Sequence, residues 1–365
     1  MFDNAQRAEF FLGASSPQGF ASRFSELSNI KDDWHLYILK GGPGSGKSGF
    51  IHTAADALED YDQHIEYVRC ASDPISFDAA IFHDLKIAVV DGTRPHVIEP
   101  SYLGAYESVI SLWDHLDYDL LEDYRDDIVR LIDRNRLANE RSNRFVSAGC
   151  KLISDSFRIS LEATDSTKIG EYVNRFALRE FKQNKRGGKP ENLSRFLSGI
   201  TPDGLMIFEN TAKCYCEKLY VIQDDYGASS RVLLSAMRSK ANEMGYNTIS
   251  CYCPTSPFEK MDHLFVPELG IGFMTSNKWH PITLEPCVKI NYKRFTDNDY
   301  LRKHKQRLSF NYKAAKELIN EAVELKSEAR DVYLELESFY HKAMDYSKVD
   351  LDIKRFIKSA KKRAR

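Results

Sequence analysis

The sequence of 365 residues lacks the features of several specialised protein classes. It holds no apolar run near the ~20 residues that a membrane-spanning helix needs. Its first residues, MFDNAQRAEFF, lack the basic and apolar regions of a secretory signal. Seven cysteines are too few and too scattered for a disulfide scaffold in a chain of this length. These absences favour a soluble protein of the reducing cytoplasm.

The chain also lacks an excess of charge of either sign. Lys and Arg number 51 and Asp and Glu number 53, so we do not expect the whole surface to bind nucleic acid. The tail differs, because Leu351–Arg365 carries seven basic residues against one acid, Asp352. Such a run could touch nucleic acid or an anionic surface, but a solvated helix end is the interpretation that we favour.

The sequence contains two related halves. Four blocks recur in the same order and at nearly constant spacing, which chance would not preserve. From the second block on, the shift is 183 residues, as from Tyr37 to Tyr220, and one inserted residue raises it to 184, as from His96 to His280. The matched blocks are Phe11–Phe20 with Phe196–Leu205, Leu36–Leu39 with Leu219–Ile222, His64–Cys70 with Thr248–Cys253, and Leu85–Pro100 with Leu269–Pro286.

We interpret this as an internal duplication whose halves meet in a linker at Lys185–Pro190, where glycine and proline gather. The predicted domains are 1–187 and 188–365. In each half, apolar runs typical of buried strands alternate with helical patterns, which predicts a parallel sheet covered on both faces. The predicted fold class is α/β, with two tandem three-layer αβα domains. Long helical extensions are expected at about 102–183 and 297–358.

A heptad pattern runs through the second extension. Apolar residues recur there in steps of four and three, as in helices that pair along a seam. A protein partner could pair with this helix, at about 310–346, but docking on the helices of the first half is the use that we favour. The seam consists of Leu318, Ala322, Leu325, Ala329, Val332, Leu336, Phe339 and Ala343.

A phosphate-binding motif follows the first apolar strand of the chain. The glycines let the backbone direct successive N–H groups at an anion, and the start of the next helix adds partial positive charge. Lys47 is placed to reach the β- and γ-phosphate oxygens, and the Ser48 hydroxyl to bind Mg²⁺. The motif G-x-x-x-x-G-K-[ST] and the residue after it comprise Gly41, Gly42, Pro43, Gly44, Ser45, Gly46, Lys47, Ser48 and Gly49. This motif is typical of P-loop NTPases, so we expect both αβα domains to be of the P-loop NTPase type.

Carboxylates near the ends of later strands could complete this site. Asp91 follows the apolar run Ile87–Val90 and would hold the hydration shell of Mg²⁺ opposite Ser48, although it could also cap the turn that follows. Asp73 is a candidate for orienting the attacking water, with a turn-capping role as the alternative. A structural, hydrogen-bonding role is favoured over catalysis for His96, because a histidine recurs at the matching position of the second half.

The second half provides an internal control. Its counterpart of the motif is Asp224–Arg231, in which Ser230 replaces Lys47, and Thr275 replaces Asp91. Because the lysine and the aspartate are lost together, we predict one working site and one degenerate site. A basic residue could also act on the γ-phosphate, and the candidates are Arg231, Arg238, Lys278 and Arg94.

These motifs resemble those of a bacterial family of tandem P-loop ATPases of uncharacterised function. Its members open each half with F-x-G-A-x-T-P-x-G and carry G-G-P-G-[ST]-G-K-S and V-D-G-T-x-P-H. The counterparts are Phe11–Gly19, Gly41–Ser48 and Val90–His96. The resemblance implies ATP binding and hydrolysis at Lys47, Ser48 and Asp91. Family members can keep a second phosphate loop, so the lack of one is a departure.

Three functions are compatible with these patterns, and we favour an Mg²⁺-dependent ATPase. A nucleotide-gated binding module with little hydrolysis is one alternative. A small-molecule or nucleotide kinase is the other, because the loop also resembles that of nucleoside monophosphate kinases. The absence of the guanine-selecting N-K-x-D motif favours ATP over GTP. A kinase lid would use basic residues that we interpret as solvated helix surface, namely Arg134, Arg136, Arg141 and Arg144.

Overall fold

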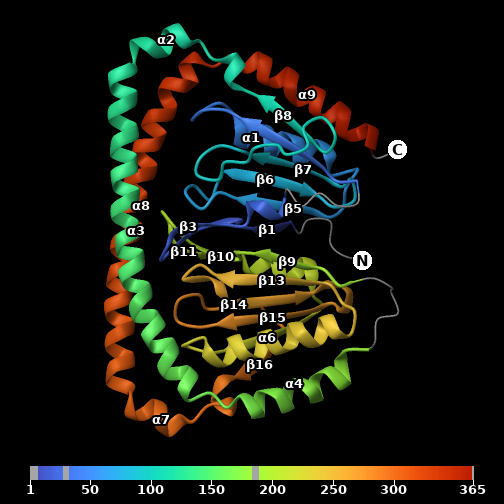
Figure 1. The fold of residues 1–365 in the computed structure, drawn as a ribbon, viewed down its shortest axis with the longest axis vertical. Coiled ribbons are helices and arrows are strands. Elements are labelled where there is room, and N and C mark those ends of the chain that lie inside the picture. The colour runs from blue at the N-terminus through green and yellow to red at the C-terminus, as the bar shows by residue number, and fades with distance from the viewer. Residues whose placement is uncertain (1–6, 28–32, 183–188, 364–365) are drawn as a thin grey trace.

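The computed structural model describes residues 7–27, 33–182 and 189–363, so most of the linker expected at Lys185–Pro190 lies outside the described residues. Two sheets lie one above the other, and two long helices, α3 (Arg125–Glu162) and α8 (Lys305–Ala343), run along one edge of both (Figure 1). Within the described ranges, no helix is long and apolar enough to cross a membrane.

The first sheet has six strands in the order β1-β5-β6-β7-β4-β8. Neighbouring strands are parallel except at β6, which is antiparallel to both β5 and β7. The strands are β1 (Ala8–Phe10), β4 (His35–Lys40), β5 (Ile65–Arg69), β6 (Phe77–Phe82), β7 (Ile87–Asp91) and β8 (Glu107–Ser111).

The second sheet repeats this plan in the order β16-β12-β15-β14-β13-β9, with β14 antiparallel to its neighbours. The common strand order confirms the internal duplication. The strands are β9 (Asn192–Arg195), β12 (Lys218–Gln223), β13 (Thr248–Cys253), β14 (Ser256–Val266), β15 (Ile271–Ser276) and β16 (Val288–Asn291).

The prediction of a parallel sheet was wrong, because both sheets are mixed. Strand β6 follows β5 after only a short turn, in which Ser76 N donates to Asp73 O (2.9 Å) and Cys70 N donates to Ser76 O (3.1 Å). A connection this short can only reverse the chain, whereas a parallel neighbour needs a crossover. The first helical extension also begins later than expected, since β8 precedes α2 (Tyr118–Asp123).

The recurring Phe11 and Phe196 blocks form small hairpins where the halves meet. The backbones of Phe11 and Phe196 exchange two hydrogen bonds, of 2.8 and 3.0 Å. The blocks are therefore packing elements. The hairpin strands are β2 (Gly13–Ser16), β3 (Gly19–Ser22), β10 (Ser198–Thr201) and β11 (Gly204–Ile207). Single 3₁₀ turns lie at Phe24–Glu26, Trp113–His115, Glu209–Thr211, Pro267–Leu269 and Tyr292–Phe295.

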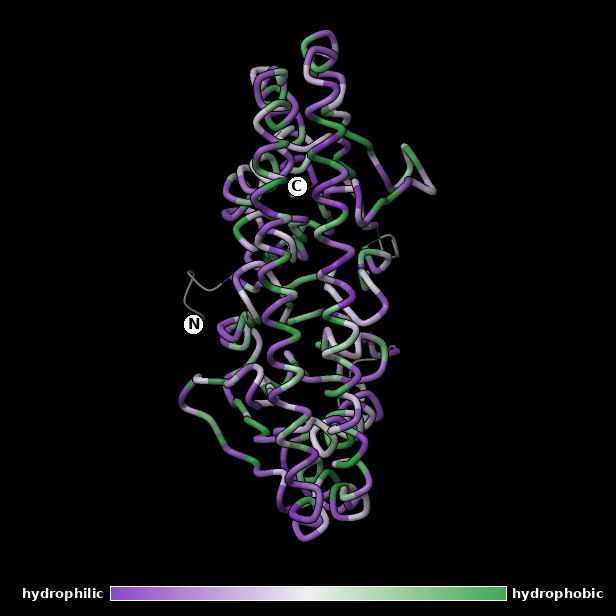
Figure 2. Tube along the Cα trace, turned by 90° about the vertical axis from the view of Figure 1, so that its left-hand side faces the viewer, coloured by the Kyte–Doolittle hydropathy of each residue, from purple (hydrophilic) through white to green (hydrophobic). Residues whose placement is uncertain are grey.

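The long helices α3 and α8 pack side by side in opposite directions, and Figure 2 looks onto this pair. At the middle, the Ser142 hydroxyl donates to the Ala322 carbonyl (2.8 Å), which requires close approach of the backbones. The buried face of α8 includes most of the predicted seam, but Ile319 and Lys326 are buried where the heptad placed Leu318 and Leu325.

The helix after each long helix covers the sheet of the other half. Helix α9 (Tyr346–Arg363) packs on α1 (Lys47–Leu58), and α4 (Ser166–Glu180) packs on α6 (Ala228–Glu243) (Figure 1). The contacts match in detail. The Phe356 ring lies 4.8 Å from that of Tyr37, and the Phe176 ring lies 5.0 Å from that of Tyr220. Each core therefore combines residues of both halves. The remaining helices are α5 (Ala212–Tyr215) and α7 (Asn298–Lys303).

The exchange of α4 and α9 predicts that stability depends on contacts between distant parts of the sequence. We expect Phe356→Ala to lower the free energy of unfolding by about 3–5 kcal/mol, because it leaves a cavity over the first sheet. Leu351→Ala, on the exposed side of the same helix, is the control and should cost less than ~0.5 kcal/mol. Urea denaturation of both variants measures the difference, and equal effects would contradict the docking of α9.

A buried ion pair also joins the halves, and it predicts a pH dependence. Arg195 on β9 donates to Glu66 on β5. Burial alone would raise the pKa of Glu66, but Arg195 and His83 outweigh burial and lower it from 4.5 to about 2. Because the pKa is lower in the folded state, this stabilisation is present above pH 4.5 and is lost as the pH falls toward 2.

The lowered pKa of Glu66 corresponds to a stabilisation of the folded state by about 3 kcal/mol. We expect the stability advantage of the wild type over Glu66→Gln to shrink by about this amount between pH 6 and pH 2.5. Urea unfolding of both proteins at several pH values measures it. An advantage that stays constant would show that the pair does not hold the Glu66 pKa down.

Candidate phosphate-binding site

The Gly41–Ser48 loop connects the end of β4 to the start of α1, as the sequence predicted. Gly44 and Gly46 have φ angles of +61° and +86°, a backbone conformation that residues other than glycine rarely adopt. Lys47 Nζ donates to the carbonyls of Gly41 (3.0 Å) and Gly42 (2.7 Å) and lies 3.7 Å from Asp91 Oδ2. The lysine and the aspartate therefore meet at the mouth of the loop, across the neighbouring ends of β4 and β7.

Ser48 and Asp91 suit a small, hard cation. Asp91 Oδ1 accepts from the Thr93 amide (2.9 Å) and hydroxyl (2.5 Å), so it does cap its turn, while Oδ2 faces Lys47. Ser48 Oγ accepts from Phe77 N (3.0 Å). Two protein oxygen ligands are enough for Mg²⁺, because this ion keeps several waters and takes its other ligands from phosphates. Across the described part of the chain, no three His, Cys, Asp or Glu residues gather as a complete metal site.

Asp78 is a residue of this site that sequence reasoning missed. It lies near the start of β6, beside Phe77, and is buried. Burial and the nearby charge of Asp91 raise its pKa to about 8, so it is mostly protonated at neutral pH. The signal was hidden because β6 was not predicted. The matching residue of the second half is also an aspartate, Asp262, which favours a structural contribution.

Asp73 and His96 have the contacts of structural residues. Asp73 Oδ2 accepts from the Ser76 hydroxyl (2.5 Å) in the turn between β5 and β6, at the same sheet edge as Asp78 and Asp91. His96 is buried, and its ring stacks on that of Phe24 at 4.1 Å. Neither ring nitrogen has a hydrogen-bond partner within the described ranges, so its structural role is packing and not the predicted hydrogen bonding. Burial lowers the pKa of His96. The histidine therefore belongs to the core, and Asp73 is held at the edge of the site.

The end of α8 and the start of α9 contact the Gly41–Ser48 loop, a contact that the sequence did not predict. Gly44 N donates to Glu337 Oε1 (3.1 Å), and the Tyr346 hydroxyl donates to Gly44 O (2.5 Å). A Cβ atom at Gly42 would lie only 3.2 Å from the Tyr340 ring. A carboxylate from the second half thus binds an amide of the first half that could otherwise bind an anion.

The corresponding loop of the second half is filled from within. The Asp224 carboxylate accepts from the amides of Tyr226 (3.1 Å), Gly227 (3.0 Å) and Ser230 (2.8 Å). The Lys260 side chain lies against Gly227, and its amine lies 2.9 Å from Asp262 Oδ1.

A cavity of about 30 Å³ lies beside Lys260, and no residue of Asp224–Arg231 lines it. A single water needs about this volume. The residues that line the cavity include Ile153, Lys260 and His280. The second loop therefore has a carboxylate of its own chain on the amides that could otherwise bind an anion.

Three of the four other basic candidates lie around the second sheet. The Arg231 guanidinium lies over the Phe157 ring (5.5 Å), Arg238 donates to the Tyr252 hydroxyl (3.0 Å), and Lys278 lies near Asp225 (3.9 Å), all around the second sheet. Arg94 is exposed. The arginines considered for a kinase lid are exposed on α3, and Arg134 and Arg136 pair with nearby acids.

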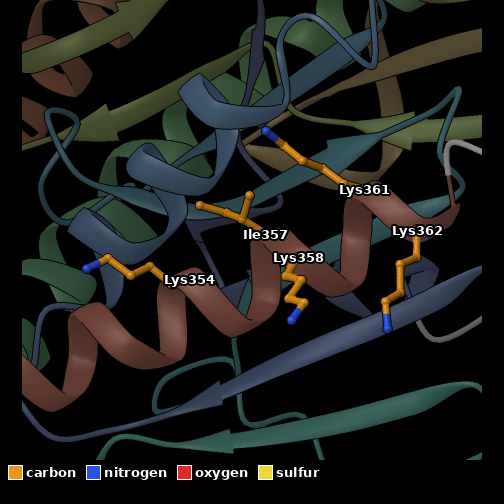
Figure 3. Close-up of a pocket in the computed structure, with 5 residues that line it drawn as sticks. All are labelled: Lys354, Ile357, Lys358, Lys361 and Lys362. Carbon is orange, nitrogen blue, oxygen red and sulfur yellow. The ribbon is translucent and has the colours of Figure 1, made fainter.

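The basic tail forms the outer side of α9. An open hollow there is lined by Lys354, Ile357, Lys358, Lys361 and Lys362, and the lysine amines diverge (Figure 3). Lys361 lies over the Tyr61 ring (4.6 Å). Arg365 lies outside the described residues. Because the amines do not converge, this surface has the character of a solvated helix face.

Comparison of the chain with protein-family models, with curated proteins and with solved structures gives no match.

The contact between Glu337 and Gly44 predicts a variant with tighter anion binding. We expect Glu337→Ala to bind Mg·ATP about tenfold more tightly, a change of ~1.4 kcal/mol in the binding free energy. The variant removes a carboxylate that repels the phosphates and that occupies the Gly44 amide. Glu335→Ala, an exposed change on the same helix, is the control and should leave affinity unchanged. Calorimetric titration measures both, and unchanged affinity for Glu337→Ala would show that this carboxylate does not compete.

Proposed function

We propose that the first half binds Mg·ATP at the Gly41–Ser48 loop and hydrolyses it, while the second half has no functional nucleotide site. The observation that carries this proposal is the meeting of Lys47 with Asp91 beside a loop of left-handed glycines at the start of α1. The resemblance to tandem P-loop ATPases supports the same function. The occupation of the second loop by Asp224 supports the restriction to one site.

The roles follow from the contacts. The backbone amides of Gly41–Gly49 and the start of α1 would bind the phosphates. Lys47 would exchange its bonds to loop carbonyls for the β- and γ-phosphate oxygens. Ser48 and Asp91 would hold Mg²⁺, which would neutralise charge on the same oxygens. Asp73, at the same sheet edge, is our candidate for orienting the attacking water.

The contacts favour an ATPase over a kinase. A kinase must hold a second, phosphate-accepting substrate, but the arginines proposed for its lid are exposed on α3, and two of them pair locally. The α8–α9 corner instead rests on the loop through Glu337 and Tyr346. Nucleotide arriving at the loop must therefore change contacts with the long helices, which also fits a nucleotide-gated binding module.

The test is a calorimetric titration with Mg·ATP in which phosphate release is followed in the same samples. We expect one nucleotide per chain with steady release, no binding by Lys47→Ala, and normal binding by Ser230→Ala, the matched change in the second loop. Loss of binding in Ser230→Ala would contradict the single-site proposal. Binding without release would favour the gated module, and no binding by the wild type would overturn the proposal altogether.

A further inference from the structure

One face of α8 carries polar residues toward the candidate site. Lys326, Arg330, Tyr333 and Glu337 are spaced by four, three and four residues, which places them on one side of the helix. Glu337 fixes this face at Gly44. Arg330 and Lys326 lie roughly 10 and 16 Å earlier along the helix axis.

The face follows the sheet edge that carries the acidic residues of the site. Arg330 interacts electrostatically with Asp73, in the turn between β5 and β6. Lys326 interacts with Cys70, which precedes that turn and contacts Asp78. The two cations therefore lie near the carboxyl end of β5 and the turn that follows it, at the sheet edge that also carries Asp78 and Asp91.

Lys326 is an unusual residue for a buried position of a helix. Only 6% of it is exposed, and it has no hydrogen-bond or ion-pair partner among the described residues. Burial lowers its pKa to about 8, so the amine still carries its charge at neutral pH. A buried cation without a counter-ion is destabilising, and lysine is rarely buried unless paired. An anion that arrives from outside the chain would supply the missing partner.

The duplication again provides a control. The isolated bridges Leu116 to Met344 and Thr164 to Thr296 match if α3 and α8 correspond with a shift of 180 residues. The residues of α3 that correspond to Lys326, Arg330, Tyr333 and Glu337 are then Val146, Cys150, Ile153 and Phe157. The polar face is thus apolar on the helix that passes over the second loop, where Asp224 takes the place of an anion.

We propose that Lys326 and Arg330 bind the terminal phosphate of the nucleotide held by the Gly41–Ser48 loop, so that the second half completes the active site of the first. This inference rests on the proposed function. Arg330 would exchange its bond to Asp203 (2.8 Å), in the turn between β10 and β11, for a phosphate oxygen.

In hydrolysis the water oxygen bonds to the γ-phosphorus while the bond to the β,γ-bridging oxygen breaks. ADP leaves with the electron pair of that bond. One water proton stays on the released phosphate, and the other passes to solvent. The charge on the γ-oxygens is stabilised by the two cations, as in other phosphoryl transfers that use an arginine.

The test compares the affinities of Mg·ADP and of a non-hydrolysable Mg·ATP analogue by calorimetry. We expect Lys326→Met and Arg330→Met each to weaken the triphosphate about 10- to 100-fold, the value of a hydrogen bond to a charged group, and the diphosphate less than about twofold. Lys316→Met, at an exposed position of α8, is the control and should change neither affinity. The melting temperature of Lys326→Met should not fall, because the change removes an unpaired buried charge.

The outcomes separate the two proposals. A wild type that binds both nucleotides, with variants that keep its preference for the triphosphate, would overturn this inference and leave the proposed function standing. An equal loss of both nucleotides would also overturn it, since it would show a general structural effect. A wild type that binds neither nucleotide would refute the proposed function and this inference together.

Discussion

The antiparallel pairing of α3 with α8 is the constraint on which the rest of the structure depends. The helices have 38 and 39 residues, so each is roughly 57 Å long and spans both sheets. Each long helix starts beside the sheet of its own half and ends beside the sheet of the other half, so the helix that follows it packs on that other sheet. The exchange of α4 and α9 is the consequence, and it makes the sheets depend on each other for burial of Phe176 and Phe356.

The same pairing explains why residues of the second half lie on the first loop. Once α8 is held in register by contacts such as Ser142 with Ala322, the position of its last turns is fixed. Glu337 then meets Gly44, and α9 begins beside Gly46. A change at the loop therefore reaches the helix pair through direct contacts, which is the physical requirement for coupling between a ligand and a distant element.

Local patterns in the sequence predicted local features well. The strand Thr248–Cys253 has the predicted bounds, and the loop lies between a strand and a helix as expected. The antiparallel β6 was missed because a single short run does not reveal its direction. The exchange of α4 and α9 was missed because it depends on packing between distant segments. The predicted heptad seam differs from the buried face of α8 in part because Lys326 is buried, and a hydrophobic pattern cannot assign a charged residue to a buried position.

The second loop occupies the same place in its half as the Gly41–Ser48 loop, between a strand and a helix. Backbone amides that converge at the start of α6 still need acceptors, because unpaired buried N–H groups are costly. Asp224 supplies those acceptors from within the chain, and the helix above the loop is apolar from Val146 to Phe157. Its matched face on α8 is polar and holds an unpaired buried lysine. The amides of the second loop are thus paired within the chain, whereas the matched face of the first half carries charges that a bound phosphate would balance.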